Sequence, residues 1–312
     1  MGERTRLLFL TGPTACGKSR VGLLLAERLA AEIISLDSMA VYRGMDIGTD
    51  KPSAEDRARV PHHLIDIRDP GQSFSTGRYV AAAEQAIAGI TGRGRQPLFV
   101  GGTALYLKAL AEGFFEGPEA DWDLRRRLRD DARLYGTHSL YQRLSSVDPA
   151  YAARIHPNDL RRIVRALEVY EKTGKPISQL HAQFGRPSGC YDCRVVCIRR
   201  NREDLRRRID RRVDTMFERG LVDEVRALLQ SGPLSREARQ ALGYRQATQH
   251  IEGHISLEDA VVLTKRDTRR FAKRQMTWFR SMPYVRWLDA APDEAAEALA
   301  ERAGELMSTG SG

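Results

Sequence analysis

The segment of residues 7–19, LLFLTGPTACGKS, restricts the fold of this chain more than any other part of its sequence. Residues 12–19 match G-x-x-x-x-G-K-[ST], the pattern of a phosphate-binding loop. The apolar residues before the loop predict a buried strand, and Val21, Leu24 and Leu25 follow it at helical spacing. Such a strand, loop and helix direct backbone N–H groups and the positive end of a helix toward an anion. We therefore expect the loop to hold a diphosphate or a triphosphate.

Two side chains of this loop add chemistry that its backbone lacks. Lys18 supplies a positive charge for phosphate oxygens, and the hydroxyl of Ser19 is a suitable ligand for Mg²⁺. The residues expected to bind the phosphates are Gly12, Pro13, Thr14, Ala15, Cys16, Gly17, Lys18 and Ser19.

Further strand-like apolar runs occur at residues 33–36, 97–100, 194–198 and 285–288. Helical patterns separate the first three strands of the chain, and strands that alternate with helices form a parallel sheet covered on both faces. The predicted fold is therefore α/β: a parallel sheet flanked by helices, like that of the P-loop NTPases.

Residues 118–187 have a different texture, because they contain no convincing strand and four helical patterns that end at Gly or Pro. This pattern predicts a helical insertion domain at residues 118–187. The remaining residues, 1–117 and 188–312, would then form the α/β core, with a basic helical part near the C-terminus.

The charge of the chain is positive and unevenly distributed. Fifty Lys and Arg residues outnumber 41 Asp and Glu residues, for a net charge of +9. The basic clusters are Arg125, Arg126, Arg127 and Arg129; Arg161, Arg162 and Arg165; Arg206, Arg207, Arg208, Arg211 and Arg212; and residues 264–280. One such run is commonly a solvated helix face. Four of them, in a chain with a phosphate-binding loop, favour a polyanionic partner such as nucleic acid.

The apolar runs and the cysteines indicate where in the cell the protein is found. No apolar run approaches the length of a membrane span, and the N-terminus lacks the pattern of a secretory signal. We expect a cytoplasmic protein with no membrane contact, and a monomer for lack of any sign of assembly. Cys190, Cys193 and Cys197 have no nearby histidine to complete a zinc site, so free thiols are favoured over zinc.

Polar residues follow two of the predicted strands. Gly101, Gly102 and Thr103 follow residues 97–100, where an ATPase would carry an acidic residue for Mg²⁺ and water. Asp37 follows residues 33–36 and has three interpretations: a ligand of Mg²⁺, a general base, or the N-cap of a helix. Residues 41–53, VYRGMDIGTDKPS, form a glycine-rich loop that suits substrate contact better than a core.

Several longer motifs in this chain resemble those of the bacterial tRNA dimethylallyltransferases. They are GPTACGKS, ISLDSMAVYRGMDIGTDKPS, HHLIDIRDP, FSTGRYV, LFVGGTALYLKAL, HPNDLRRIVRALEVYEKTGKPIS, RQALGYRQ and AKRQMTWFR, in this order. The resemblance covers about residues 7–288. The phosphate-binding loop is shared with many families, whereas the other motifs are far more specific.

The resemblance implies a reaction and roles for single residues. Dimethylallyl diphosphate would give its dimethylallyl group to N6 of the adenosine that is 3′-adjacent to the anticodon of a tRNA, and pyrophosphate would leave. Asp37 would orient the amine and take its proton. Lys18, Thr103, Ser19 with Mg²⁺, and either Arg208 or Arg212 would stabilise the charge on the leaving diphosphate.

The resemblance also implies contacts with the tRNA anticodon stem-loop, partly through the insertion domain. The adenine must leave its stack to reach the diphosphate, so we expect it to be flipped into a channel. The implied contact residues are Asp37, Ser38, Met39, Ala40, Arg125, Arg161, Arg162, Ile163, Val164, Arg165, Gln240, Ala241, Leu242, Gly243, Tyr244 and Arg245. Tyr244, Trp278 and Phe279 are candidates for base stacking, although aromatic residues of this kind more commonly pack in the core.

Two other functions fit parts of the pattern. A small-molecule or nucleotide kinase would use ATP at the same loop and could use the helical insertion as a lid. An RNA-binding protein without catalytic activity could use a nucleotide as a switch. The absence of an acidic residue after residues 97–100 argues against both.

Overall fold

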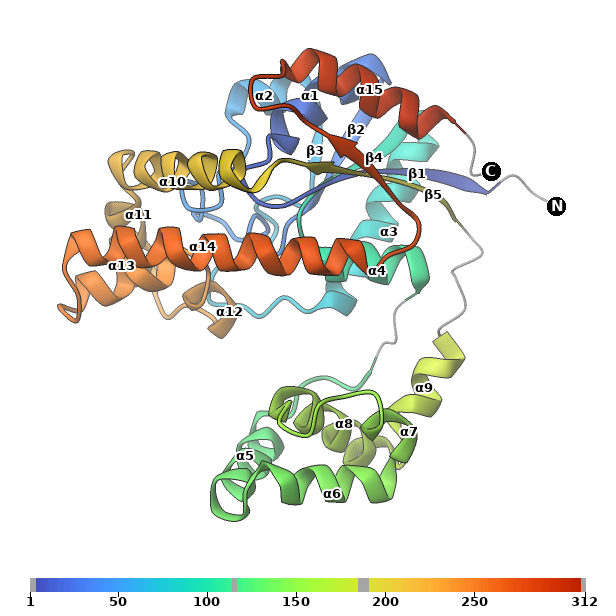
Figure 1. Ribbon diagram of the computed structural model, residues 1–312, viewed down its shortest axis with the longest axis vertical. Coiled ribbons are helices and arrows are strands. Elements are labelled where there is room, and N and C mark those ends of the chain that lie inside the picture. Colours follow the sequence, from blue (N-terminus) through green and yellow to red (C-terminus); the bar gives the residue numbers. More distant parts are fainter. Residues whose placement is uncertain (1–3, 114–116, 185–190, 310–312) are drawn as a thin grey trace. The chain divides into compact units, whose positions relative to one another are not determined.

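A computed structural model describes residues 4–113, 117–184 and 191–309 of the protein (Figure 1). The chain forms two compact units. The core unit comprises Met1–Ala109 and Gly189–Gly312, and the helical unit comprises Leu110–Ser188. The sequence placed the start of the helical insertion later, at residue 118, and its end at residue 187.

A parallel sheet organises the core unit. Its strands are β1 (Thr5–Thr11), β2 (Ala31–Leu36), β3 (His62–His63), β4 (Gln96–Gly101), β5 (Tyr191–Arg199) and β6 (Val285–Asp289). Within the described residues they pair in the order β3-β2-β4-β1-β5-β6, and every pairing is parallel. The predicted fold class is confirmed. Strand β3 was not predicted, because two histidines carry no strand-like apolar pattern.

Helices cover both faces of this sheet (Figure 1). The helices of the core unit are α1 (Lys18–Arg28), α2 (Ala54–Arg59), α3 (Thr76–Gly92), α10 (Arg202–Glu218), α11 (Leu221–Ser231), α12 (Arg236–Arg239), α13 (Tyr244–Ile251), α14 (Leu257–Arg280) and α15 (Ala296–Ser308). Helix α4 (Ala104–Glu112) begins in the core unit and continues across the boundary at Leu110. Alternate strand residues such as Leu8 and Leu10 pack with α1 and α15. On the opposite face Phe9 stacks on Phe99 at 4.6 Å, and α3 anchors the sheet through the Tyr79 hydroxyl.

The sheet places several loops at one edge. The carboxyl ends of β1, β2 and β4 lead into the phosphate-binding loop, into Asp37 and into the Gly102 turn. Strand β5 ends at the same edge and leads into α10, which packs with α14. Parallel pairing therefore brings segments that are far apart in the sequence to one place.

The helical unit has its own apolar core, built from residues such as Leu128, Leu144 and Leu167. Its helices are α5 (Trp122–Tyr135), α6 (Thr137–Val147), α7 (Pro149–Ala152), α8 (Leu160–Thr173) and α9 (Ile177–Phe184). In the described part of the chain, no helix combines the length and the apolar character needed to cross a membrane.

A buried carboxylate ties α5 to α8 within the helical unit. The Glu168 side chain is 0% exposed and accepts hydrogen bonds from Arg125 Nε at 2.9 Å, from Arg165 Nη1 at 2.6 Å and from the Asp121 N–H at 2.7 Å. Burial acts to raise the pKa of Glu168, but the hydrogen bonds from Arg125 and Arg165 outweigh it and lower this pKa below its usual value. Glu168 is therefore a buried carboxylate ion, and the helical unit depends on its hydrogen bonds with Arg125 and Arg165 for stability.

We predict that Glu168→Ala lowers the free energy of unfolding of the helical unit by about 3 kcal/mol, because two arginines lose their buried partner. Trp122 reports on this unit alone once Trp278 and Trp287 are replaced by Phe. Urea unfolding of the full chain, followed by Trp122 fluorescence, measures the effect. The control is Glu171→Ala, since Glu171 is an exposed residue of the same helix as Glu168 and pairs with Arg143. If Glu168→Ala lowered the free energy of unfolding no more than this control, the role of Glu168 would be contradicted.

The same carboxylate makes this stability depend on pH. Because the pKa of Glu168 is lower in the folded protein than in the unfolded chain, its contribution is complete above the unfolded pKa of about 4.3. The contribution is lost as the pH falls through the folded pKa. We expect Glu168→Gln to flatten the acid limb of the stability curve, measured by the same unfolding experiment from pH ~7 to ~3.

Candidate active site

The phosphate-binding loop lies between β1 and α1 and has the open backbone that an anion requires. Gly12 and Gly17 have φ values of 150° and 98°, and Ala15 adopts a left-handed conformation with φ of 64°. A Cβ at Gly12 would lie 2.8 Å from the Ile198 carbonyl oxygen of β5, so only glycine fits there. The loop is thus formed with its backbone pressed against the neighbouring strand.

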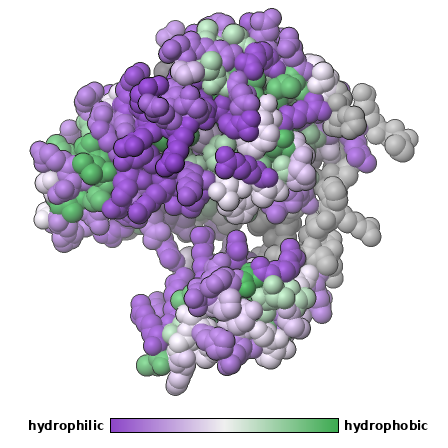
Figure 2. All heavy atoms as spheres, in the orientation of Figure 1, coloured by the Kyte–Doolittle hydropathy of each residue, from purple (hydrophilic) through white to green (hydrophobic). Residues whose placement is uncertain are grey.

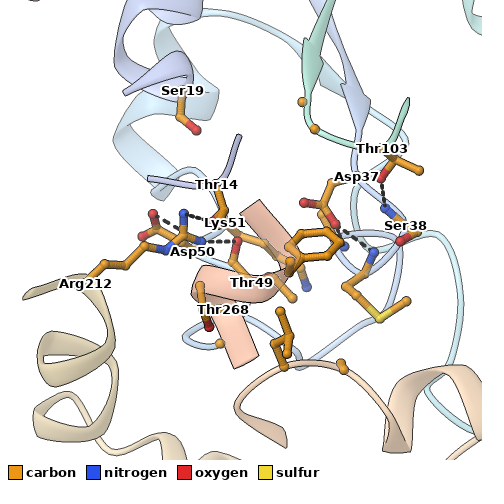
Figure 3. A pocket seen from close by; sticks show the side chains of 18 of the residues that line it. Thr14, Ser19, Asp37, Ser38, Thr49, Asp50, Lys51, Thr103, Arg212 and Thr268 are labelled. Carbon is orange, nitrogen blue, oxygen red and sulfur yellow. Dashed lines mark hydrogen bonds and ion pairs between the residues drawn. The ribbon is translucent and has the colours of Figure 1, made fainter. Parts of the chain in front are cut away.

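A cavity of about 940 Å³ adjoins this loop in the core unit (Figure 3). It brings together many of the residues expected from the sequence. Those that line it are Thr14, Lys18, Ser19, Asp37, Ser38, Met39, Ala40, Thr103, Arg212, Gln240, Ala241, Leu242, Tyr244 and Arg245. Its volume lies within the range of small-molecule sites.

Asp37 lies where β2 ends, on the opposite side of the view from Arg212 and Thr14 (Figure 3). Its Oδ1 accepts hydrogen bonds from the N–H groups of Met39 at 2.8 Å and Ala40 at 3.3 Å. The residues after Asp37 form a turn and not a helix, so the interpretation of Asp37 as a helix N-cap is wrong. The carboxylate binds the backbone donors of this turn instead. Among the described residues no partner occupies Oδ2, which leaves one carboxylate oxygen for a ligand in the cavity.

Thr103 connects the Gly102 turn to the turn after β2. Its Oγ1 accepts a hydrogen bond from the Ser38 N–H at 3.2 Å, and its own N–H donates to the Leu36 carbonyl oxygen at 3.0 Å. Its hydroxyl hydrogen is then available to donate into the cavity that the residue lines.

The structure separates the two arginines between which the sequence could not choose. Arg212 lines the cavity, and its guanidinium donates to Thr14 Oγ1 at 3.1 Å and to the Thr49 carbonyl oxygen at 3.4 Å. Arg208 is absent from the lining and donates instead to Asp204 and to the Pro292 carbonyl oxygen. The geometry thus favours Arg212 as the arginine near the diphosphate.

Gln275 of α14 is a site residue to which the sequence analysis gave no role. Its Oε1 accepts a hydrogen bond from the Thr14 N–H at 2.9 Å, and its Nε2 donates to the Gly102 carbonyl oxygen at 2.8 Å. The signal was available, because Thr264, Thr268, Phe271 and Gln275 recur at helical spacing on one face of an arginine-rich helix.

The loop of residues 41–53 serves two purposes, and the prediction of substrate contact is wrong for its first part. Tyr42 and Met45 are fully buried in the core. Lys51 is 2% exposed and donates to the Tyr42 carbonyl oxygen and to two carboxylates, of Asp46 and Asp66. Residues 48–51 line the cavity.

Two of the three candidate stacking residues belong to the core. Tyr244 is fully buried and donates its hydroxyl to Glu224 at 2.6 Å, and Phe279 is also fully buried. Trp278, which is 37% exposed, remains accessible. Glu224, which the sequence analysis did not identify, also accepts the Ile47 N–H at 2.7 Å and so holds the loop of residues 41–53 against α11.

Basic side chains surround the core-unit cavity. Arg245, Arg266, Arg270 and Arg274 line it, and Asp267 orients Arg245 at 2.5 Å and Arg266 at 3.0 Å. Figure 2 shows that hydrophilic side chains cover most of the visible face over α10 and α14. This surface suits a polyanion.

In the helical unit the predicted contact residues differ in their availability. Arg161 and Arg162 are exposed. Arg125 and Arg165 are bound to Glu168, as described above, and are only partly exposed. Ile163 and Val164 lie in the apolar core of the unit, so their side chains are unavailable to RNA.

The described cysteines are free thiols. Cys16, Cys193 and Cys197 are free cysteines, and burial raises the pKa of Cys193 to about 12. Cys190 lies outside the described residues. Over residues 4–113, 117–184 and 191–309, no cluster of three or more His, Cys, Asp or Glu side chains could hold a metal ion.

Comparison with known proteins finds relatives that match along most of the chain. Residues 40–282 match the family model described as IPP transferase. The tRNA dimethylallyltransferase of Symbiobacterium thermophilum is 50% identical over 96% of this chain and 94% of its own length. That of Geobacter metallireducens is 49% identical over 92% and 93%.

Solved structures lead to the same family. The full-length tRNA isopentenylpyrophosphate transferase of Bacillus halodurans superposes with a TM-score of 0.72 and 41% identity, covering 97% of this chain and 96% of that one. A eukaryotic dimethylallyltransferase described as acting on tRNA gives a TM-score of 0.77 and 29% identity, covering 91% of this chain and 74% of that one. The resemblance found in the sequence is confirmed: the chain belongs to the IPP transferase family.

Proposed function

We propose that this protein is a tRNA dimethylallyltransferase. It transfers the dimethylallyl group of dimethylallyl diphosphate to N6 of the adenosine 3′-adjacent to the anticodon, and it releases pyrophosphate. The observation that carries this proposal is that one cavity joins a phosphate-binding loop to an aspartate with a free carboxylate oxygen. We expect the enzyme to act in the cytoplasm.

The phosphate-binding loop would hold the leaving group. As the bond between C1 of the dimethylallyl group and the diphosphate oxygen breaks, negative charge grows on that oxygen. Lys18, Arg212 and Thr103 line the cavity. We expect the two cations, the loop N–H groups and the Thr103 hydroxyl to stabilise this charge. Preorganised donors of this kind are commonly the largest single contribution to catalysis.

The residues of the loop also fit a Mg²⁺ ion. The Ser19 side chain is exposed at the start of α1 and lines the cavity, and Mg²⁺ prefers a few protein oxygens combined with phosphate oxygens. Ser19 would hold the ion, which when bound neutralises part of the charge of the diphosphate.

Asp37 would act on the other substrate. The exocyclic amine of adenine is a weak nucleophile, and it loses a proton when its nitrogen bonds to C1. The hydrogen bonds of Oδ1 with the N–H groups of Met39 and Ala40 fix the carboxylate. Its Oδ2 could then accept a hydrogen bond from the amine and take the amine proton as the new bond forms. The adenine would reach this oxygen by flipping out of the anticodon loop.

The overall activity is tested with Mg²⁺, dimethylallyl diphosphate and unmodified tRNA that has an adenosine-rich anticodon loop. We expect mass spectrometry of the digested RNA to reveal an adenosine heavier by one dimethylallyl group in place of a hydrogen. An unmodified RNA, with ATP consumed in a parallel reaction, would instead identify a kinase.

For the general base we predict that Asp37→Asn lowers kcat by about 10²–10⁴-fold with little change in the Kd for tRNA. The amide keeps an oxygen for the Met39 N–H but cannot take a proton. Single-turnover kinetics and filter binding measure the two quantities. Asp56→Asn, at another carboxylate that lines the same cavity and contacts Ser53, is the control and should have a far smaller effect. A fall in tRNA affinity as large as the fall in rate would make Asp37 a binding residue.

The two arginines of α10 give a paired prediction. Arg212→Ala should lower kcat by about 10²-fold, the cost of removing one donor to the leaving group. Arg208→Ala should lower the thermal stability and leave kcat nearly unchanged, because Arg208 binds Asp204 and Pro292. Steady-state kinetics of both variants measure the two effects. A larger fall in kcat for Arg208→Ala than for Arg212→Ala would refute the choice of Arg212.

Binding of RNA by the helical unit is tested through salt dependence. Replacing both Arg161 and Arg162 by Ala should weaken tRNA binding and reduce the slope of log K against log [salt] by about 0.7–0.9 for each phosphate that the variant no longer neutralises. Arg133→Ala, at an exposed arginine of α5, should leave the slope unchanged. An identical slope in all three proteins would show that Arg161 and Arg162 do not bind RNA phosphates.

A further inference from the structure

The side-chain amide of Gln275 joins two loops of the active site. The side chain belongs to α14 and is 6% exposed. Its oxygen accepts the Thr14 N–H of the phosphate-binding loop, and its nitrogen donates to the Gly102 carbonyl oxygen at the end of β4. A side-chain amide can accept a hydrogen bond at its oxygen and donate one from its nitrogen without carrying a charge.

The fit around this amide is tight. A Cβ at position 102 would collide with Nε2 of Gln275, so the glycine lets the helix side chain reach the backbone. A buried amide costs free energy unless its hydrogen bonds are made, and a side chain that only filled space there would be better apolar. The two bonds therefore point to a purpose beyond packing.

Both loops lead directly to reacting groups. Thr14 also accepts the Arg212 guanidinium through its hydroxyl, so the loop is held by α14 on one side and α10 on the other. Gly102 precedes Thr103, whose hydroxyl oxygen accepts the Ser38 N–H beside Asp37. Gln275 is thus the link between the diphosphate side of the cavity and the Asp37 side.

We propose that Gln275 is a positioning residue for the transfer reaction. Its amide holds the phosphate-binding loop at Thr14 and the turn at Gly102 in fixed relation, and thereby places the leaving diphosphate relative to Asp37. The inference rests on the proposed function for its reaction step. Its effect on diphosphate binding can be measured without tRNA.

The test uses the full-length Gln275→Met variant, which keeps the side-chain length and removes both hydrogen bonds. We expect the Kd for inorganic pyrophosphate with Mg²⁺, measured by calorimetry, to rise about tenfold, which corresponds to about one buried hydrogen bond. We expect kcat to fall at least as much and the Kd for tRNA to stay the same.

Gln246→Met is the matched control. Gln246 is 1% exposed and also makes two hydrogen bonds, accepting the Gly243 N–H and donating to Asp267, but it does not contact the phosphate-binding loop. We expect a similar loss of thermal stability and an unchanged Kd for pyrophosphate. Equal effects of the two variants on this Kd would overturn the proposal, as would a Gln275→Met enzyme that loses stability alone.

A second variant keeps the test decisive if Gln275→Met does not fold. In Gln275→Glu one carboxylate oxygen can still accept the Thr14 N–H. The other carboxylate oxygen replaces the amide nitrogen, so it faces the Gly102 carbonyl oxygen and cannot donate a hydrogen bond to it. Protonation of the introduced carboxylate restores the donor, and burial raises the pKa of a glutamate. The pyrophosphate affinity of the variant relative to the wild type should therefore recover as the pH falls from about 8 to about 5.5. A ratio that is independent of pH and equal to one would overturn the proposal.

These measurements separate two kinds of failure. A wild-type protein that binds pyrophosphate but leaves tRNA unmodified would refute the proposed function. An active wild type whose pyrophosphate affinity and kcat do not depend on Gln275 would refute this inference alone.

Discussion

Parallel pairing of β2, β4, β1 and β5 is the constraint on which the active site depends. Because these neighbouring strands run in one direction, their carboxyl ends open on one edge of the sheet. The phosphate-binding loop, Asp37 and the Gly102 turn are the continuations of three of them, and α10 with Arg212 continues the fourth. Ladder hydrogen bonds between strands thus place groups that are nearly 200 residues apart in the sequence around one cavity, as for Thr14 and Arg212.

Within this frame, a few buried polar groups orient the reacting ones. Gln275 joins the two sides of the cavity, and Asp37 is fixed by the N–H groups of its own turn. Each of these bonds would cost free energy if it were broken without water to replace it, so each restricts the site to one arrangement. This rigidity is what the proposed transfer from a bound diphosphate to a tRNA base would require.

Carboxylates decide which of the many arginines are available. Glu168 binds Arg125 and Arg165, Asp204 binds Arg200 and Arg208, and Asp267 orients Arg245. A count of basic residues therefore overstates the surface that RNA can use. Arg162, which pairs with Asp159, and Arg266 and Arg270, which share Asp267, still keep about half or more of their side chains exposed. Together with the exposed Arg161 they form the smaller set that we propose for contact with RNA.

The sequence by itself determined the phosphate-binding loop, the parallel α/β fold and the family. These follow from short-range patterns: glycine spacing, apolar runs and motifs whose residues are neighbours in the chain. It also placed Asp37 and Thr103 just after two predicted strands, and the carboxyl ends of neighbouring strands in a parallel sheet meet at one edge. Only the tertiary structure distinguishes Arg208 from Arg212, which lie one helical turn apart on α10 and differ in what other segments place opposite them. It alone revealed the contacts of Gln275 and Glu168 and the burial of Tyr42, because burial and hydrogen-bond partners depend on contacts between segments distant in the chain.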